Sequence, residues 1–362
     1  MIKKLITIVG ARPQFIKSSI VSKKLKKNKG IEEIYIHTGQ HYDDKMSDIF
    51  FEELEIDKPK YNLHIGSGNH GEQTGKMIIE IEKVLLEEKP DGVLLYGDTN
   101  STLAGAIAAS KLNIPIFHVE GGIRENNLKE PEEVNRILTD HVSTIIFTPL
   151  LSSLKDAKKE GLLNRSINSG DVMLDRILEN KSLYSNKNLL KKLNLEEKKY
   201  YLLTLHRPVN VDIKERLQRL LTIINSLDKK VVFPIHPRTK NKMENFNIKK
   251  EEFDNIIFIE PLGYNDLMTY IKYSSAVMTD SGGLQKEACF LGKKCIVIFD
   301  YTPWKEIEEL KGIYVWKDLN EIQRLREELM ENYFNDKIYD IFGNGEASQK
   351  IVDMIDEYLI SR

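Results

Sequence analysis

Cysteine is scarce in this chain of 362 residues, which contains only Cys289 and Cys295. Both lie in apolar runs, so we interpret them as small core residues in a reducing compartment, not as a disulfide or a metal site. Long hydrophobic runs are also missing, because no apolar stretch reaches the roughly 20 residues that a membrane-spanning helix needs. The sequence therefore predicts neither a disulfide-stabilised secreted protein nor a membrane protein.

We expect no secretion signal either, although Lys3 and Lys4 before the apolar run 5–9 superficially suggest one. That run is too short, and Arg12 follows it without a small-residue cleavage pattern. We expect a first buried strand here and a cytoplasmic location. Strong charge of one sign is also lacking, since the net charge is −2, so no nucleic-acid or membrane partner is expected.

The pattern of apolar runs indicates two α/β domains. Short apolar runs alternate with helical patterns, and they lack the polar alternation of half-exposed strands, as expected of parallel strands covered on both faces. The length also favours two domains. We expect a Rossmann-like domain at 1–169, a second at 170–347, and an amphipathic helix within 348–362 that packs back on the first. The expected strands are 5–9, 34–38, 93–96, 116–119 and 144–147, then 201–204, 230–233, 256–259, 276–279 and 295–299.

The motif GARPQFIK, residues 10–17, directly follows the first expected strand. Ligands of open α/β sheets bind at the carboxyl ends of the strands. Gly10 would let the backbone approach a ligand, and Arg12 and Lys17 add cations suited to a diphosphate at a helix N-terminus. The alternative is a turn with two surface cations. The motif is not GxGxxG, which argues against NAD.

Three acidic residues follow strand ends or begin a helix. Asp98 in YGDTNS could cap a helix, whereas Glu120 in HVEGG precedes two glycines, which is difficult to explain by packing. Glu132 in PEEVNR should share a polar helix face with Asn135 and Arg136, and a solvated face is the alternative. The opposite face carries Val134, Ile137, Leu138 and His141.

The second half contains TLHRP with His206, HPRT with His236, and TDSGGLQKE at 279–287. In the last motif Ser281, Gly282 and Gly283 would place a hydroxyl and open N–H groups at a helix N-terminus, which suits a phosphate. Glu287 lies about one turn further, where it could accept from ribose hydroxyls. No GxxxxGK[ST], HExxH or CxxC pattern occurs, so neither ATP chemistry, a metal nor another cofactor is expected.

Taken together, the motifs GARPQFIK, HTGQH, YGDTNS, HVEGG, PEEVNR, TLHRP, HPRT and TDSGGLQKEA resemble, in order, the non-hydrolysing UDP-N-acetylglucosamine 2-epimerase family. The resemblance covers essentially the whole chain. It implies two Rossmann-like domains facing a central cleft, the GT-B type of fold, with the sugar on the first domain and UDP on the second. It also implies a UDP-sugar as substrate, a homodimer and a role in polysaccharide or glycan biosynthesis.

The family reaction assigns roles to these residues. UDP would leave C1 while C2 loses its proton, and UDP would add back after reprotonation on the opposite face. The implied catalytic residues are Asp98, Glu120, Glu132, His206 and Lys17. The implied substrate-binding residues are Arg12, Asn135, Arg136, His236, Ser281, Gly282, Gly283 and Glu287. A glycosyltransferase of the same fold is the alternative from another class, and it would need an acceptor groove and one base, not three acids.

Several positions depart from the commonest family pattern. Gln14 replaces the glutamate of GTRPE, Lys286 replaces a glutamate of QEEA, and Trp304 replaces the arginine of TERPE. Phe299 also stands where an arginine is common. With GDVM at 170–173, these departures resemble a branch acting on UDP-2,3-diacetamido-2,3-dideoxy-glucuronate. UDP-N-acetylglucosamine is the alternative substrate. Because two arginines of the common pattern are missing, the sequence does not identify which residues contact the diphosphate on that side.

Overall fold

The computed structural model describes residues 2–39, 51, 53–331 and 337–361, which divide into two compact units. Unit 1 comprises Met1–Glu179 and Ile341–Arg362, and unit 2 comprises Asn180–Asp340. Unit 1 extends beyond residue 169 because α7 (Val172–Glu179) packs on α1 (Arg12–Leu25) and α17 (Ala347–Ile360). Among the described residues, no helix is both long and apolar enough to cross a bilayer.

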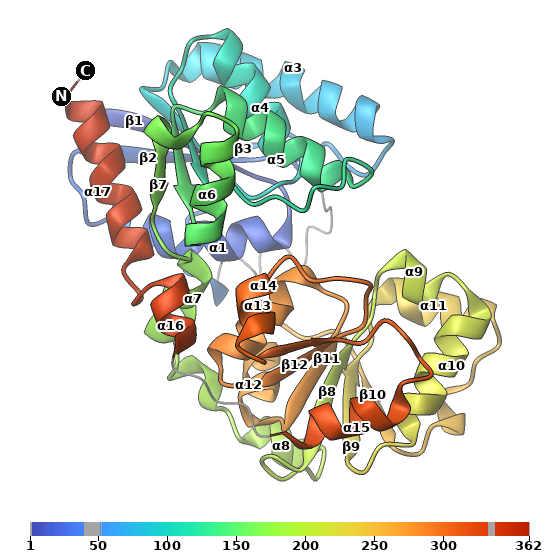
Figure 1. The fold of residues 1–362 in the computed structure, drawn as a ribbon. Helices are drawn as coiled ribbons and strands as arrows, with labels where there is room; N and C mark the ends of the chain where they lie inside the picture. The colour runs from blue at the N-terminus through green and yellow to red at the C-terminus, as the bar shows by residue number, and fades with distance from the viewer. Residues whose placement is uncertain (1, 40–50, 52, 332–336, 362) are drawn as a thin grey trace. The chain divides into compact units, whose positions relative to one another are not determined.

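Unit 1 contains a parallel sheet with the strand order β3-β2-β1-β4-β5-β6-β7 (Figure 1). Its strands are β1 (Lys3–Val9), β2 (Ile31–His37), β3 (Tyr61–Asn62), β4 (Gly92–Tyr96), β5 (Ile116–Val119), β6 (Ile145–Thr148) and β7 (Ser166–Asn168). The expected strands are all present, whereas β3 and β7 were not anticipated. These two lie at the sheet edges, are two and three residues long and only partly buried, so they lack an apolar run.

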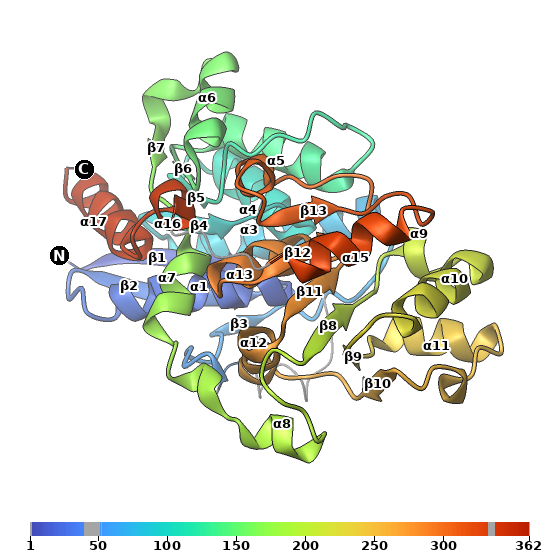
Figure 2. The same ribbon diagram turned by 60° about the horizontal axis from the view of Figure 1, so that its bottom comes forward.

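Helices cover both faces of this sheet. The helices are α1, α3 (His70–Glu88), α4 (Asn100–Lys111), α5 (Pro131–Val142), α6 (Leu151–Lys159), α7 and α17. On one face α1, α7 and α17 pack together (Figure 1 and Figure 2). On the other, Ile6 and Ile8 of β1 pack with Met77 of α3 and Ala104 of α4 in one apolar cluster. Burial on both faces explains why the central strands are continuously apolar.

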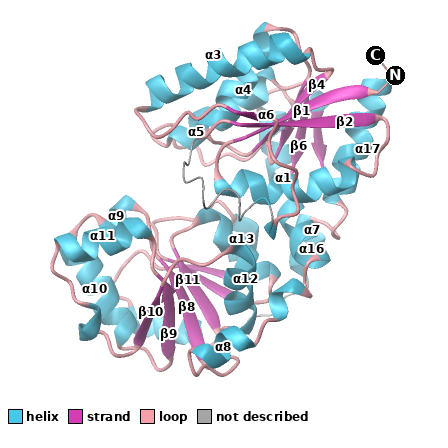
Figure 3. Ribbon diagram, turned by 180° about the vertical axis from the view of Figure 1, so that it is seen from behind, coloured by secondary structure: helices cyan, strands magenta, loops and turns pink. Residues whose placement is uncertain are grey.

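Unit 2 repeats this plan with a parallel sheet in the order β10-β9-β8-β11-β12-β13 (Figure 3). Its strands are β8 (Tyr200–Thr204), β9 (Lys230–Pro234), β10 (Ile256–Ile259), β11 (Ala276–Thr279), β12 (Lys294–Val297) and β13 (Ile313–Val315). Its helices are α8 (Asn188–Lys192), α9 (Pro208–Val211), α10 (Lys214–Asn225), α11 (Pro237–Asn245), α12 (Tyr264–Tyr273), α13 (Gly282–Phe290), α14 (Lys305–Glu309) and α15 (Ile322–Met330). A short α16 (Lys337–Phe342) spans the boundary between the units. The edge strand β13 was also not anticipated.

Both sheets have a topological switch point. In unit 1, β1 lies between β2 and β4, and in unit 2, β8 lies between β9 and β11. Loops leave the carboxyl ends of such neighbouring strands in opposite directions, and ligands of open α/β sheets bind there. The turns after β1 and β4, and those after β8 and β11, are therefore the places to look for chemistry.

Candidate active site

The turn after β1 is held by Gln14, in the first turn of α1. Its side-chain oxygen accepts from the backbone N–H groups of Gly10 (2.8 Å) and Ala11 (3.0 Å). Its amide nitrogen donates to the Tyr96 carbonyl at the end of β4 and to the Thr102 hydroxyl, both at 2.9 Å. Gln14 thus joins the two turns at the switch point, and a carboxylate would lack the donor for the Tyr96 carbonyl.

Gly10 is required by side chains of the protein itself. A Cβ atom there would lie 2.1 Å from the Thr38 hydroxyl oxygen and 2.2 Å from that of Ser101. These two hydroxyls bond to each other at 2.8 Å. The space at Gly10 is therefore filled by this pair, which differs from the expectation that Gly10 admits a ligand.

Lys17 of α1 forms a close ion pair with Glu120, directly after β5. Both side chains are about nine-tenths buried. Glu120 has a φ of 66°, a left-handed conformation that costs an ordinary residue roughly 1 kcal/mol. A Cβ atom on Gly97, the residue before Asp98, would lie 3.3 Å from Lys17 Nζ and 3.6 Å from Glu120 Oε2. The Lys17–Glu120 pair therefore sits against the turn that carries Asp98.

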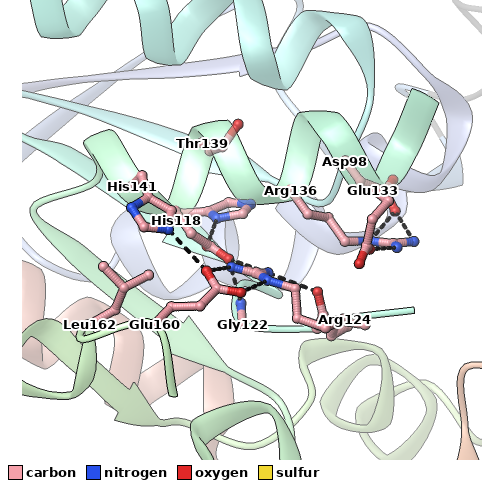
Figure 4. A network of polar contacts seen from close by, with 12 residues as sticks. Asp98, His118, Gly122, Arg124, Glu133, Arg136, Thr139, His141, Glu160 and Leu162 are labelled. Atoms are coloured by element: carbon pink, nitrogen blue, oxygen red, sulfur yellow. Dashed lines mark hydrogen bonds and ion pairs between the residues drawn. The ribbon is translucent and has the colours of Figure 1, made fainter. Parts of the chain in front are cut away.

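Asp98 is paired with Arg136 of α5, which also holds two further carboxylates (Figure 4). Arg136 Nη2 lies 2.7 Å from Asp98 and 3.0 Å from Glu125, and Nη1 lies 2.9 Å from Glu133. Burial alone would lower the pKa of Arg136, but the charges of Asp98 and Glu125 outweigh it and raise that pKa. Asn135 adds a bond to the Asp98 carbonyl at 2.9 Å. Arg136 and Asn135 thus fix the position of Asp98 in this structure.

Helix α5 turns a polar face toward the protein. Its buried residues are Glu133, Asn135, Arg136, Thr139 and Asp140. Leu138 is 44% exposed, and the imidazole of His141 is also exposed, so the face that carries them is directed outward in part. Glu132 is exposed in the first turn, whereas its neighbour Glu133 is buried and was overlooked. The cause is the cluster of ion pairs beneath α5, which periodicity of apolar residues cannot reveal.

Beneath Glu120 lies a buried charged network that the sequence did not reveal. Asp140 accepts from His118 at 2.7 Å, from the Gly122 N–H at 2.9 Å and from Arg124 at 2.7 Å. Figure 4 labels these three partners. Burial raises the pKa of Asp140, but the bonds and charges of His118 and Arg124 outweigh it, so this pKa lies below its ordinary value. Arg124 also binds both carboxylate oxygens of Glu160.

This network explains the first glycine after Glu120. A Cβ atom on Gly121 would lie 2.5 Å from Ile146 Cγ2 and 2.6 Å from Asp140 Oδ1. Packing therefore accounts for Gly121, contrary to the expectation from the sequence. The signal that could have identified the network is His118, an ionisable residue in an otherwise apolar and buried strand.

In unit 2, Asp280 organises the turn after β8. Its carboxylate accepts from the backbone N–H groups of His206 and Arg207, from the Asn210 amide, and from His206 Nδ1 at 3.0 Å. Burial raises the pKa of Asp280, but the His206 bond and charge and the other donors outweigh it and lower the pKa. With Nδ1 directed at Asp280, Nε2 is the ring nitrogen of His206 that can meet a ligand. Asp280 was overlooked, although it immediately precedes Ser281.

The N-terminus of α13 follows β11. Ser281 is the N-cap residue and its side chain makes no capping bond. Gly283 is exposed, and a Cβ atom on it would meet nothing within 4 Å. Arg207 lies beside this end, since its Nη2 is 3.9 Å from a Cβ built on Gly282, and its guanidinium stacks 4.1 Å from the centroid of the Phe299 ring. Open N–H groups and a cation at one helix end suit a phosphate.

The side chains of Lys286 and Trp304, two residues that depart from the common family pattern, contact each other. Lys286 is 1% exposed and its Nζ lies 4.4 Å from the centroid of the Trp304 ring. Trp304 Nε1 donates to the Gly282 carbonyl at 2.9 Å. Lys286 therefore does not point to solvent, and its charge faces an aromatic ring. Glu287 is also buried and accepts from the Tyr264 hydroxyl at 2.9 Å.

The remaining expected site residues lie at element ends. Arg12 begins α1 and is partly exposed, and His236 is the exposed N-cap of α11, with its ring 5.5 Å from that of His206. In the motif HTGQH, residues 40 and 41 lie outside the described residues. Across the described stretches, no three His, Cys, Asp or Glu side chains are grouped so that they could hold a metal ion.

The family model for UDP-N-acetylglucosamine 2-epimerase matches residues 23–356. The chain belongs to this family. The epimerase is 47% identical to a UDP-N-acetylglucosamine 2-epimerase homolog of Methanococcus maripaludis over 97% of this chain and 99% of that one. It is 42% identical, over the same shares, to the UDP-2,3-diacetamido-2,3-dideoxy-D-glucuronate 2-epimerase of Pseudomonas aeruginosa.

A solved structure shows the same fold. The crystal structure of the Methanocaldococcus jannaschii UDP-GlcNAc 2-epimerase, in complex with UDP-GlcNAc and UDP, matches with a TM-score of 0.88 and 43% identity over 97% of this chain and 99% of that chain. The expected α/β fold of GT-B type is therefore confirmed, and the protein is an isomerase, a non-hydrolysing UDP-sugar 2-epimerase.

Proposed function

We propose that the epimerase inverts C2 of a UDP-linked acetamido sugar by elimination and re-addition of UDP. The observation that carries this proposal is the pair of carboxylates at neighbouring strand ends in unit 1, Glu120 against Lys17 and Asp98 against Arg136. One reversible C–H cleavage needs a base on one face of the ring and an acid on the other. Two held carboxylates, with the exposed Glu132 at the start of α5, supply such groups.

The reaction consists of elimination of UDP followed by its re-addition. A carboxylate removes the C2 proton while the C1–O bond breaks, which leaves UDP as an anion and a C1=C2 double bond in the sugar. A second acid then returns a proton to C2 from the opposite face, and the UDP oxygen bonds again to C1. Cations stabilise the charge that grows on the diphosphate, and loss of one such donor typically costs about 10²–10³ in rate.

We assign UDP to unit 2. The open N-terminus of α13, with Ser281, Gly282 and Gly283, would receive the diphosphate, and Arg207 and His206 would supply positive charge. The guanidinium of Arg207 stacks on the ring of Phe299. Phe299 is the residue that stands where an arginine is common in the family. This arrangement supports a diphosphate site despite the missing arginine.

For the sugar, we propose UDP-2,3-diacetamido-2,3-dideoxy-glucuronate. The support is the 42% identical relative of that name. Lys286 adds no support, because it is buried and its charge faces the Trp304 ring. Gln14 no longer adds support, since its amide is engaged with two turns inside unit 1. UDP-N-acetylglucosamine is the second candidate, favoured by the relative of that name from Methanocaldococcus jannaschii, 44% identical over 97% of this chain.

The test is incubation of the purified protein with each UDP-sugar separately, without any acceptor, followed by NMR. Inversion at C2 supports the proposal, and a higher kcat/KM for the uronate supports the substrate assignment. Transfer that requires an added acceptor would instead indicate a glycosyltransferase, and free UDP accumulating with turnover would indicate a hydrolysing enzyme. The proposal also includes a homodimer, to be checked by light scattering, which acts in the cytoplasm in glycan biosynthesis.

A further inference from the structure

We infer that His118, buried in β5, is a positioning residue for the two carboxylates Asp98 and Glu120, and that it acts with a proton on each ring nitrogen. This inference rests on the proposed function for its catalytic consequence. The structural part of the inference is that a buried imidazolium connects the turn after β4 with the turn after β5. His118 is 0% exposed and cannot itself reach a substrate, so its role must pass through its partners.

Both nitrogens of His118 face acceptors. Nε2 lies 2.7 Å from the Gly97 carbonyl oxygen, and Nδ1 lies 2.7 Å from Asp140 Oδ1. A carbonyl oxygen can only accept, so Nε2 carries a proton. If the ring were neutral, Nδ1 would carry a lone pair and no proton. Nδ1 and the Asp140 carboxylate oxygen would then be two acceptors in contact. Both contacts are hydrogen bonds when Nδ1 also carries a proton and donates it to Asp140.

The neighbouring charges keep Asp140 in its anionic form. Its second oxygen accepts from Arg124 and from the Gly122 N–H. Burial raises the pKa of Asp140, but His118 and Arg124 outweigh it and lower that pKa, so the proton between Oδ1 and Nδ1 lies on the imidazole. Arg124 is balanced in turn by Glu160. Two cations, His118 and Arg124, thus face two carboxylates. His118, Arg124 and Asp140 are almost fully buried, whereas Glu160 is 27% exposed, and breaking a buried ion pair costs several kcal/mol.

The two bonds of His118 connect the turns that carry the acids. Gly97 immediately precedes Asp98, and Asp140 holds the N–H two residues after Glu120. The Lys17–Glu120 ion pair lies against the same Gly97. The imidazolium therefore sets where one turn lies with respect to the other, and a catalytic carboxylate displaced by about 1 Å can lose about 10²-fold in rate.

The first test reads the ring directly. NMR of the protein labelled with ¹⁵N-histidine should show a proton on each nitrogen of His118 at pH 7, and Asp140→Asn should convert the ring to the form protonated on Nε2 only. A neutral His118 in the unsubstituted protein would overturn the inference. This measurement needs no activity, so it remains decisive if the protein epimerises none of the UDP-sugars and the proposed function fails.

The second test separates positioning from stability. His118→Gln keeps one amide donor, which can reach Gly97 or Asp140 but not both. We expect kcat to fall about 10- to 100-fold with little change in KM or in UDP affinity, and faster hydrogen exchange at the Gly97 and Gly122 amides. The matched control is His141→Gln, which removes an exposed histidine bonded to Glu160 and should leave all these quantities unchanged.

Two outcomes of the second test would overturn the inference. One is an unchanged kcat in His118→Gln, and the other is a loss of UDP affinity equal to the loss of kcat, which would indicate general unfolding. If His118→Gln does not fold, the ring protonation of the unsubstituted protein and of Asp140→Asn decides the question.

Discussion

Replacing Trp304 should destabilise unit 2 chiefly by uncovering the charge of Lys286. The ammonium lies 4.4 Å from the ring centroid, and the two residues are 1% and 5% exposed. A desolvated cation–π contact contributes about 2 kcal/mol, and the bond from Trp304 Nε1 to the Gly282 carbonyl contributes about 1 kcal/mol. Trp304→Leu should cost at least the sum, about 3 kcal/mol, plus a term for the lost volume.

A double-mutant cycle isolates the cation–π part. Lys286→Met removes the charge and keeps an aliphatic stem, so in this background Trp304→Leu should cost about 1–2 kcal/mol less than in the original protein. Trp304→Phe serves as the control, because it keeps an aromatic ring for the ammonium while it loses the Nε1 donor and part of the ring volume. Its cost should be about 1–2 kcal/mol.

The assay is urea unfolding followed by the fluorescence of Trp316, which is fully buried in unit 2 and is the other tryptophan of the chain. Trp316 is present in every variant, so each curve reports the same unit. A coupling free energy below about 0.3 kcal/mol between Trp304 and Lys286 would refute the reasoning, since that is the scatter of independent sites.

Four further results are expected. In D₂O, both epimers should gain deuterium at C2 only, and product that keeps its original C2 hydrogen in mass spectra would contradict elimination. Asp98→Asn and Glu132→Gln should each lower turnover strongly and leave UDP affinity, measured by calorimetry, nearly unchanged, whereas Ser281→Ala should weaken UDP binding. Gly121→Ala should lower the thermal stability of unit 1 by about 1–3 kcal/mol, because its Cβ would overlap Ile146 and Asp140; an unchanged melting temperature would count against this. The lowered pKa of Asp140 contributes stability that is complete above the unfolded-state value of about 3.9 and is lost as the pH falls through the lower folded-state pKa. Acid unfolding curves of Asp140→Asn should lack this part of the pH dependence.

The central strands and the places of the motifs could be predicted from the sequence, because both depend on local patterns. A strand buried on both faces is continuously apolar, and a motif such as YGDTNS directly after it must lie at the carboxyl edge of the sheet. Edge strands such as β3 and β13 are short and bury fewer side chains, so they carry little signal.

Side-chain partnerships were less accessible to sequence reasoning. The orientation of α5 depends on two carboxylates from other segments, Asp98 and Glu125, that meet Arg136, and apolar periodicity says nothing of such contacts. The contact between Lys286 and Trp304 joins residues 18 positions apart, one in α13 and one directly before α14, so neither departure taken alone reveals it. The tertiary structure sets such pairwise contacts.

The composition of unit 1 from two chain segments has a consequence for synthesis. Helix α17 packs on α1 and α7, and Asp175 of α7 accepts from the Ala347 and Ser348 N–H groups and the Ser348 hydroxyl. These partners leave the ribosome only after the whole of unit 2 has been made. The segment translated first therefore waits for its last helix, with the apolar side of α1 uncovered, while the continuous segment 180–340 can complete its own core without delay. Chaperones that shield nascent chains should accordingly bind the early segment while the rest of the chain is translated.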